Sequence, residues 1–164
     1  MEYLNVYDKN GNLLDKKIAR IDKDTLPNDE YFMVVLIFVE NERGEFLLQK
    51  TSKIKNSVIA TTGGHVTYGD TPLETVIKEC KEELGIDLLE SDIKYIYTEN
   101  DGYCLIGVYY TKKDIDISKI ILQEEEVESI NWYTKEEIEN FINNNKLRKS
   151  NVKPYRRVLE YIKK

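Results

Sequence analysis

The segment from Gly64 to Ile86 constrains the fold of this chain most, because it joins a glycine-rich turn to a helix with two chemically different faces. It reads GHVTYGDTPLETVIKECKEELGI. Residues 71–74 match a T-x-x-E capping box with proline at the first helical position, and Gly85 suits the left-handed residue that ends a helix. The segment therefore predicts a helix over residues 72–84.

The two faces of this helix differ in charge. Three glutamates lie three and four residues apart, so that they share one face: Glu79, Glu82 and Glu83. The neighbouring stripe is apolar and consists of Leu73, Val76, Ile77, Cys80 and Leu84. One face is thus expected to pack on a core while the other gathers negative charge.

A bound cation is the simplest explanation for the three glutamates. Clustered carboxylates repel one another and weaken a helix unless a positive charge lies among them. No histidine lies at ligand spacing and Cys80 belongs to the apolar stripe, so the ligands are all oxygen, which favours Mg²⁺ or Mn²⁺ over zinc. The alternative is a solvated acidic helix face; the surrounding residues favour the metal site.

These residues resemble the signature of the Nudix hydrolase family, G-x5-E-x7-R-E-U-x-E-E-x-G-U, in which U is aliphatic. The register is unbroken, with the matching positions filled by Gly64, Glu79, Glu82, Glu83, Gly85 and Ile86. Asp70 stands where the family has Glu, Lys78 where it has Arg, and Cys80 at an aliphatic position. Because lysine lacks the planar fork that grips two carboxylate oxygens, we expect a reduced rate and not a loss of activity.

The resemblance implies an α/β fold, a Nudix-type α/β/α sandwich around a central mixed β-sheet. It covers about residues 31–142 of a single domain, 1–164, with an N-terminal β-hairpin and a C-terminal helix appended. Asn10-Gly11 indicates the hairpin, and the apolar run 31–39 indicates a strand buried on both faces. Further strands are expected at 45–50, 93–98, 103–110 and 129–133. The last helix, near Pro154, has an apolar stripe suited to packing or to a dimer surface, formed by Tyr155, Val158, Leu159 and Ile162.

The resemblance also implies hydrolysis of a nucleoside diphosphate linked to another group, in which water attacks phosphorus while metal ions neutralise the diphosphate. Mg²⁺ or Mn²⁺ would be held by Glu79, Glu82 and Glu83 together with the backbone carbonyl of Gly63. Lys78 replaces the family's arginine, which holds the carboxylates in place.

The carboxylate that removes the proton from water is left open, because Nudix hydrolases use either a box glutamate or an acid on a later loop. The later acidic segment contains Glu124, Glu125, Glu126 and Glu128. We favour Glu126 as base or extra ligand, with Glu125 next and Asp101 third. The alternative is a merely solvated acidic loop.

Three residues are candidates for binding substrate. His65 is the only histidine, adjoins the box glycines and titrates near neutrality when unperturbed; a packed loop histidine is the alternative. Tyr68 and Tyr103 are placed to stack on a base, although with twelve tyrosines in the chain a chance match is the competing explanation.

Two other function classes fit parts of the chain. Residues 4–64 also resemble the isopentenyl-diphosphate isomerase branch of Nudix proteins, but that chemistry needs a reactive cysteine beside the site, and none occurs before Glu79. A nucleotide-binding Nudix domain without turnover is the third class. Such a domain would usually lack some of the metal glutamates, and all three are present.

Charge and composition narrow the partners and the compartment. A formal net charge of −6 argues against a long nucleic acid and favours a small anionic substrate that arrives with its cation. Cys80 and Cys104 look like buried small hydrophobes, which indicates a reducing compartment. Neither a signal segment nor an apolar run that could cross a membrane is found. We therefore expect a cytoplasmic protein, with a homodimer left open and the exact substrate unassigned.

Overall fold

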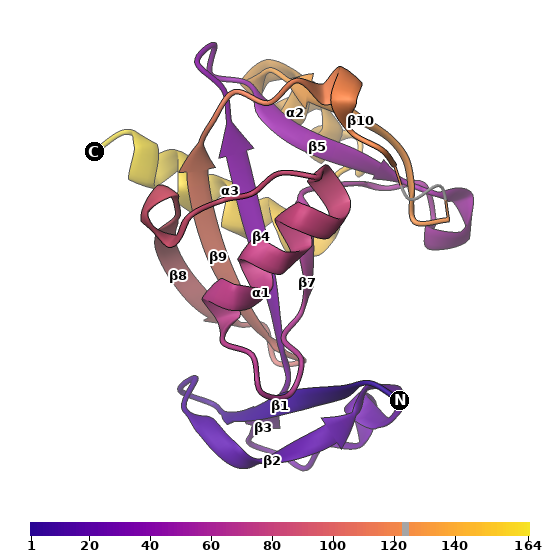
Figure 1. Ribbon diagram of the computed structural model, residues 1–164, viewed down its shortest axis with the longest axis vertical. Coiled ribbons are helices and arrows are strands. Elements are labelled where there is room, and N and C mark those ends of the chain that lie inside the picture. Colours follow the sequence, from indigo (N-terminus) through magenta and orange to yellow (C-terminus); the bar gives the residue numbers. More distant parts are fainter. Residues whose placement is uncertain (123–124) are drawn as a thin grey trace.

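The computed structural model describes residues 1–122 and 125–164 and contains two sheets (Figure 1). The smaller sheet has the order β2-β1-β3 and comprises β1 (Tyr3–Asp8), β2 (Leu13–Ala19) and β3 (Glu30–Tyr31). The predicted hairpin is confirmed. The Asp8 carboxylate accepts hydrogen bonds from the backbone N–H groups of Asn10 and Asn12, and Gly11 has a φ of 85°. A 3₁₀ helix, η1 (Arg20–Thr25), connects β2 to β3.

The larger sheet is mixed, as expected, and has the order β10-β5-β4-β9-β8. Its strands are β4 (Met33–Glu40), β5 (Phe46–Thr51), β6 (Ile59–Ala60), β7 (Thr62–His65), β8 (Lys94–Asn100), β9 (Leu105–Lys112) and β10 (Val127–Tyr133). β6 pairs with β5, and β7 pairs with β4. β4 and β9 are parallel and the other pairs are antiparallel.

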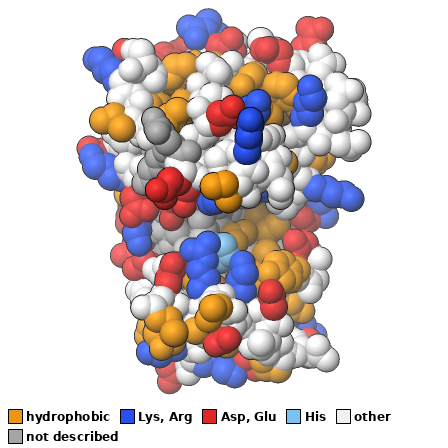
Figure 2. Space-filling model, turned by 90° about the vertical axis from the view of Figure 1, so that its right-hand side faces the viewer, with side chains coloured by type: hydrophobic (Ala, Val, Ile, Leu, Met, Phe, Trp, Pro, Cys, Tyr) orange, Lys and Arg blue, Asp and Glu red, His pale blue; other side chains and the backbone are white. Residues whose placement is uncertain are grey.

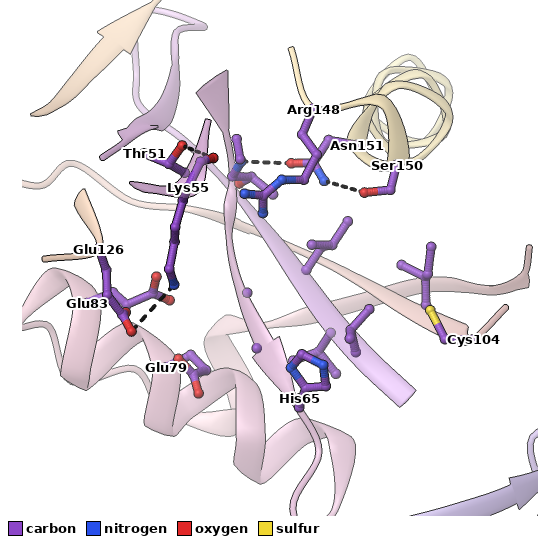
Figure 3. Close-up of a pocket in the computed structure, with 18 of the residues that line it drawn as sticks. Thr51, Lys55, His65, Glu79, Glu83, Cys104, Glu126, Arg148, Ser150 and Asn151 are labelled. Atoms are coloured by element: carbon purple, nitrogen blue, oxygen red, sulfur yellow. Dashed lines mark hydrogen bonds and ion pairs between the residues drawn. The ribbon is translucent and has the colours of Figure 1, made fainter. Parts of the chain in front are cut away.

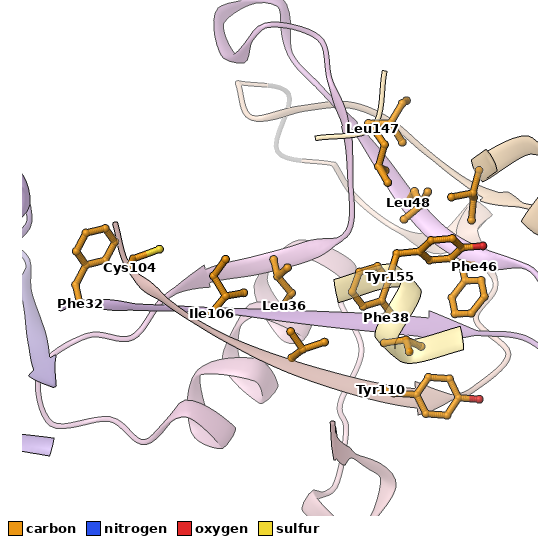
Figure 4. Packing of buried hydrophobic residues seen from close by; sticks show 14 of the residues in the cluster. Phe32, Leu36, Phe38, Phe46, Leu48, Cys104, Ile106, Tyr110, Leu147 and Tyr155 are labelled. Carbon is orange, nitrogen blue, oxygen red and sulfur yellow. The ribbon is translucent and has the colours of Figure 1, made fainter. Parts of the chain in front are cut away.

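Helices cover both faces of this sheet, which confirms the α/β/α sandwich. In Figure 1, α1 (Pro72–Glu79) lies on one face and α3 (Lys149–Ile162) on the other, with α2 (Lys135–Asn143) beside it. The alternation of β4 explains the two layers. Val35 and Ile37 share a buried cluster with α1, while Leu36 and Phe38 share one with α2 and α3 (Figure 4).

The helix of the Gly64–Ile86 segment begins and ends where predicted but is not α-helical throughout. Thr71 and Glu74 form the capping box, and Gly85 has a φ of 66°. The last turn, η3 (Cys80–Leu84), is π-helical: the Gly85 N–H reaches back five residues to the Cys80 carbonyl as well as to the Lys81 carbonyl, and the Ile86 N–H caps the helix end on the Cys80 carbonyl. The turn that carries Glu82 and Glu83 is therefore wider than the α-helical period assumes, a distortion frequent at functional sites.

The C-terminal helix packs on the core. Tyr155 and Val158 are buried in the cluster of Figure 4, and Leu159 and Ile162 pack against it. The predicted apolar stripe thus covers the sheet, which favours the packing alternative over a dimer surface. Cys80 and Cys104 are buried free thiols, as expected. Among the described residues, no helix is long and apolar enough to cross a membrane.

The loop between β7 and α1 joins the smaller sheet to the larger one. Leu4 forms an isolated bridge with Thr67, and the Asn5 N–H donates to the Val66 carbonyl. The Asn5 side chain also bonds to the backbone of Gly69 and Asp70. These bonds hold the loop before α1 against the N-terminal sheet. Next to this contact, a hollow lies between the two sheets.

Candidate functional site

A cleft of about 860 Å³ opens at this hollow (Figure 2). One wall contains every predicted member of the metal site, Gly63, Glu79, Glu82 and Glu83, and also Lys78; we call it the acidic wall. Its opposite side is formed by the N-terminal sheet and the β8–β9 loop, with Glu2, Arg20, Lys23, Asp101, Tyr103 and Cys104. Figure 2 shows basic side chains and the pale blue His65 in the hollow, with acidic side chains along its rim.

Two adjacent glycines of β7 leave no room for a side chain, Gly63 against β4 and Gly64 against the acidic helix. Gly63 pairs with Leu36 of β4, and a Cβ atom at Gly63 would lie 2.3 Å from the Val35 carbonyl oxygen. A Cβ atom at Gly64 would lie 2.5 Å from the Cδ of Glu79. Any side chain at Gly64 would displace that carboxyl group, so the first glycine of the box is needed to seat Glu79 in the cleft.

Glu79 and Glu83 form a half-buried acidic pair. Burial, followed by the charge of Glu82, raises the pKa of Glu79. Burial, followed by the charge of Glu79, raises the pKa of Glu83. Gln49 donates from Nε2 to Oε1 of Glu83 at 3.3 Å, whereas Oε2 of Glu83 is buried and has no hydrogen-bond partner among the described residues. A buried carboxylate oxygen without a partner is costly and strongly favours a proton or a cation.

The residues fit a hard divalent cation, although they are not assembled around one. Within residues 1–122 and 125–164, no three His, Cys, Asp or Glu side chains converge closely enough to hold a metal as they stand. The unpartnered Oε2 of Glu83 and the glycine cradle beneath Glu79 nevertheless provide oxygen donors at one place. Glu82 is exposed on the same wall, so its side chain is free to turn toward the pair.

The two charged positions at which the box departs from the family differ in location. Lys78 is exposed at the cleft and forms no ion pair with any described residue. Asp70 does not line the cleft; its carboxylate accepts a 2.7 Å hydrogen bond from the Thr67 hydroxyl and closes the turn before α1. Thus Asp70 shapes the loop, while Lys78 stands near the glutamates without clamping them.

Of the later acids, Glu126 reaches the cleft most directly, and its Oε1 lies 3.5 Å from Nζ of Lys55 (Figure 3). Glu125 does not line the cleft, and neither does Glu128, whose Oε2 lies 3.5 Å from Nζ of Lys50. Glu124 lies outside the described residues. Asp101 lines the cleft, but its Oδ1 accepts from the N–H groups of Tyr103 and Cys104, so it orders its own loop.

His65 lines the cleft as a neutral ring. Burial first, and then the charges of Arg20, Lys23 and Lys55, lower its pKa to about 4. The structure therefore differs from the expectation that this side chain titrates near neutrality, because its burial among cations disfavours the charged form. Its Nε2 lies 3.1 Å from Nζ of Lys23, and since an ammonium can only donate, Nε2 is the acceptor.

The structure separates the two candidate tyrosines. Tyr103 lines the cleft, donates from its hydroxyl to Asp24 at 2.6 Å and meets the Phe32 ring edge-on at 5.2 Å. Tyr68 is half exposed, does not line the cleft and lies under the Lys17 ammonium. Only Tyr103 therefore stands where a substrate could touch it.

Two further cleft residues carried no sequence signal as site residues. Arg148, just before α3, is half-buried, points into the cleft in Figure 3 and has no carboxylate partner within ion-pair distance among the described residues. Burial lowers its pKa, an effect that the charge of Glu83 opposes. Cys104 also lines the cleft, on the opposite side of the view in Figure 3 from Glu83. Burial raises the pKa of its thiol to about 12, so it is not a thiolate at neutral pH.

Comparisons with known proteins agree on one family. The NUDIX domain model matches residues 30–158. The Uncharacterized Nudix hydrolase lin0387 of Listeria innocua is 32% identical over 85% of this chain and 83% of its own length. The NAD-capped RNA hydrolase NudC of Pseudomonas aeruginosa is 26% identical over 62% of this chain and 35% of its own length.

A solved structure agrees at the level of the fold. The crystal structure of DR0079 from Deinococcus radiodurans superposes with a TM-score of 0.70, covering 89% of this chain and 91% of that one. Its sequence is 20% identical, so this likeness supports the architecture and leaves the chemistry to the residues of the cleft.

Proposed function

Since this chain belongs to the NUDIX domain family, we propose that it hydrolyses a pyrophosphate bond in a nucleoside diphosphate derivative, with the help of bound Mg²⁺ or Mn²⁺. One observation carries the proposal: Glu79, Glu82 and Glu83 line one wall of an open cleft, where an oxygen of Glu83 is buried with no hydrogen-bond partner in the part of the chain that the structure describes. We also infer that residues 1–164 act as one domain, because both sheets line this cleft.

The acidic wall is assigned to the cation. Glu79, Glu82 and Glu83 would hold it, together with the backbone carbonyl of Gly63 on the neighbouring strand. A bound divalent cation neutralises phosphate oxygens and activates water for attack on phosphorus. Gln49 is buried, and its bonds to Thr62 and Glu83 keep the Glu83 carboxylate turned toward the cleft.

The remaining charged residues are assigned to the substrate and to proton transfer. Glu126 is the proposed general base, because it is the acid of the later loop that lines the cleft and its Oε1 is bound only loosely, to Lys55 at 3.5 Å. Arg148 is proposed to stabilise the negative charge that grows on the leaving phosphate, since its guanidinium lacks a carboxylate partner among the described residues. Lys78 supports the glutamates as a point charge.

The decisive experiment compares wild type with Glu83→Gln. Hydrolysis is followed by chromatographic separation of substrate and nucleotide products, with Mg²⁺ and with Mn²⁺, on nucleoside triphosphates, ADP-sugars, NAD-type dinucleotides, dinucleoside polyphosphates and coenzyme A. We expect wild type to cleave at least one of these and Glu83→Gln to lose most of that activity while remaining folded. Glu90→Gln, an exposed glutamate outside the cleft, is the matched control and should keep full activity.

The other two function classes make different predictions in the same assay. A binding domain without turnover would show ligand-dependent shifts in melting temperature but no product at any metal concentration. An isomerase would convert isopentenyl diphosphate to its allylic isomer, and only this result would give Cys104 a role in the chemistry. Equal turnover by wild type and Glu83→Gln would contradict the hydrolase mechanism proposed here.

A further inference from the structure

The side of the cleft opposite the glutamates carries basic side chains that have no role in the cleavage proposed at the acidic wall. Arg20 and Lys23 both line the cleft and come from η1 of the N-terminal sheet. The NUDIX domain match begins at residue 30, so these two cations come from the part of the chain that precedes it. An appended element therefore supplies part of the wall of the proposed active site.

Lys23 is a half-buried cation. No Asp or Glu side chain within residues 1–122 and 125–164 lies within ion-pair distance of its ammonium. The contacts of Nζ are Nε2 of His65 at 3.1 Å and the face of Phe32, whose ring centroid is 5.0 Å away. An ammonium has three donors, and His65 accepts only one. A partly desolvated cation with unused donors is stabilised by an anion that enters the cleft.

The position of Lys23 is fixed by its neighbours. The next residue, Asp24, accepts a 2.6 Å hydrogen bond from Tyr103, which ties η1 to the β8–β9 loop. His65 stacks on Phe32 with the ring centroids 5.6 Å apart, and Phe32 is 2% exposed. Lys23 is thus held by the rigid interior, unlike a mobile surface lysine, and the entropy lost when it binds a ligand is small.

We propose that Lys23, with Arg20 beside it, binds a phosphate group of the substrate that lies outside the pyrophosphate bond being cleaved. The inference rests on the proposed function, because it adds to the substrate a feature that the cleavage site alone does not require. It selects nucleoside diphosphate derivatives that carry an additional phosphate, such as nucleoside triphosphates, dinucleoside polyphosphates or coenzyme A. The Arg20 guanidinium pairs with Glu2 at 3.2 Å but has five N–H donors, so it can also donate hydrogen bonds to a second oxyanion. His65 acts here as a positioning residue for Lys23.

The first test is a comparison of substrates with and without the extra phosphate. For Lys23→Met, we expect KM for the substrate with the additional phosphate to rise about 10-fold or more, the size of a lost charge-assisted hydrogen bond, with a much smaller change in kcat. The preference for that substrate over its analogue without the phosphate should fall by the same factor. Lys9→Met, at an exposed lysine of the β1–β2 turn that does not line the cleft, is the matched control. An unchanged preference in Lys23→Met would overturn the inference.

The second test does not depend on turnover. His65 is the only histidine, so its ring gives a single set of NMR signals, which can be followed at fixed pH in EDTA while inorganic phosphate is added against a chloride control. We expect a saturable shift in wild type and in Glu83→Gln, and its loss in Lys23→Met. If the protein binds phosphate but hydrolyses none of the substrates, the proposed function is contradicted and the phosphate site at Lys23 is supported. If the protein hydrolyses a substrate but wild type shows no saturable shift, or Lys23→Met shows an equal shift, the proposed function stands and the phosphate site at Lys23 is overturned.

Discussion

The carboxyl group of Glu79 lies against the backbone of Gly64 so closely that a Cβ atom there would stand 2.5 Å from its Cδ. Gly64→Ala should therefore leave the sheet intact and displace Glu79, with a loss of about 100-fold in kcat/KM, as expected when a catalytic group moves by about 1 Å. Steady-state kinetics together with thermal melting will show whether activity falls while stability is kept.

Gly107→Ala is the matched control for this substitution. A Cβ atom at Gly107 would meet its nearest neighbours at ordinary contact distances of 3.5–3.7 Å, and the site lies outside the cleft. It should retain nearly full activity. Wild-type kinetics in Gly64→Ala would mean that Glu79 is not held where the structure places it.

The acidic pair predicts how the stability of the metal-free protein depends on pH. Burial, followed by the charges of Glu82 and Glu79 respectively, raises the pKa values of Glu79 and Glu83 above the ordinary carboxyl value of 4.5. The folded state therefore binds more protons than the unfolded state, and the free energy of unfolding falls as pH rises above 4.5, until the raised pKa values have been passed. Denaturant unfolding in EDTA across this range measures the effect.

Two controls separate this effect from other titrations. Mg²⁺ should restore the stability at high pH, because it replaces the protons with a cation. Glu83→Gln should flatten the decline, since it removes the group whose charge is most disfavoured. If the free energy of unfolding of the metal-free wild type did not fall above pH 4.5, and its pH dependence matched that of Glu83→Gln, the pair would not be buried as described.

The resemblance to the Nudix signature predicts the sandwich, whereas local patterns predict the acidic wall. Capping at Thr71, the continuous apolar run of β4 and the spacing of the three glutamates each involve a few neighbouring residues. Arg148 and Lys23 have no such pattern, since only the tertiary fold brings the start of α3 and η1 to the same cleft. Local patterns also could not show the π-helical last turn or the lowered pKa of His65, which depend on tertiary surroundings.

The proposed base predicts a difference between two glutamates on one loop. Glu126→Gln should lower kcat by about 10²–10⁴, the usual contribution of a general base, with little change in KM. Glu128→Gln should stay near wild type, because Glu128 points to Lys50 and does not line the cleft. Steady-state kinetics at saturating substrate measure the difference, and equal effects from both variants would assign the base elsewhere.

The exposed position of Lys78 predicts a gain of function. Lys78 lines the cleft without pairing to a described carboxylate, and arginine there could grip two oxygens at once. Lys78→Arg should raise kcat/KM and lower the Mg²⁺ concentration needed for half-maximal rate. Titrating the rate with Mg²⁺ tests both effects, and an unchanged curve would remove the missing fork as an explanation for slow turnover.

Substitution of Arg148 should weaken transition-state stabilisation, whereas substitution of its neighbour Lys149 should not. Because its half-buried guanidinium faces the cleft that Glu83 also lines, Arg148→Met should lower kcat by about 10²–10³, comparable to the loss of one oxyanion donor. Arg148→Lys keeps the charge but not the planar fork, so its kcat should lie between those of wild type and Arg148→Met. Lys149→Met removes an exposed charge one residue away, outside the cleft, and should leave kcat unchanged. If Arg148→Met instead raised KM at constant kcat, the guanidinium would contribute to ground-state binding and not to the chemical step.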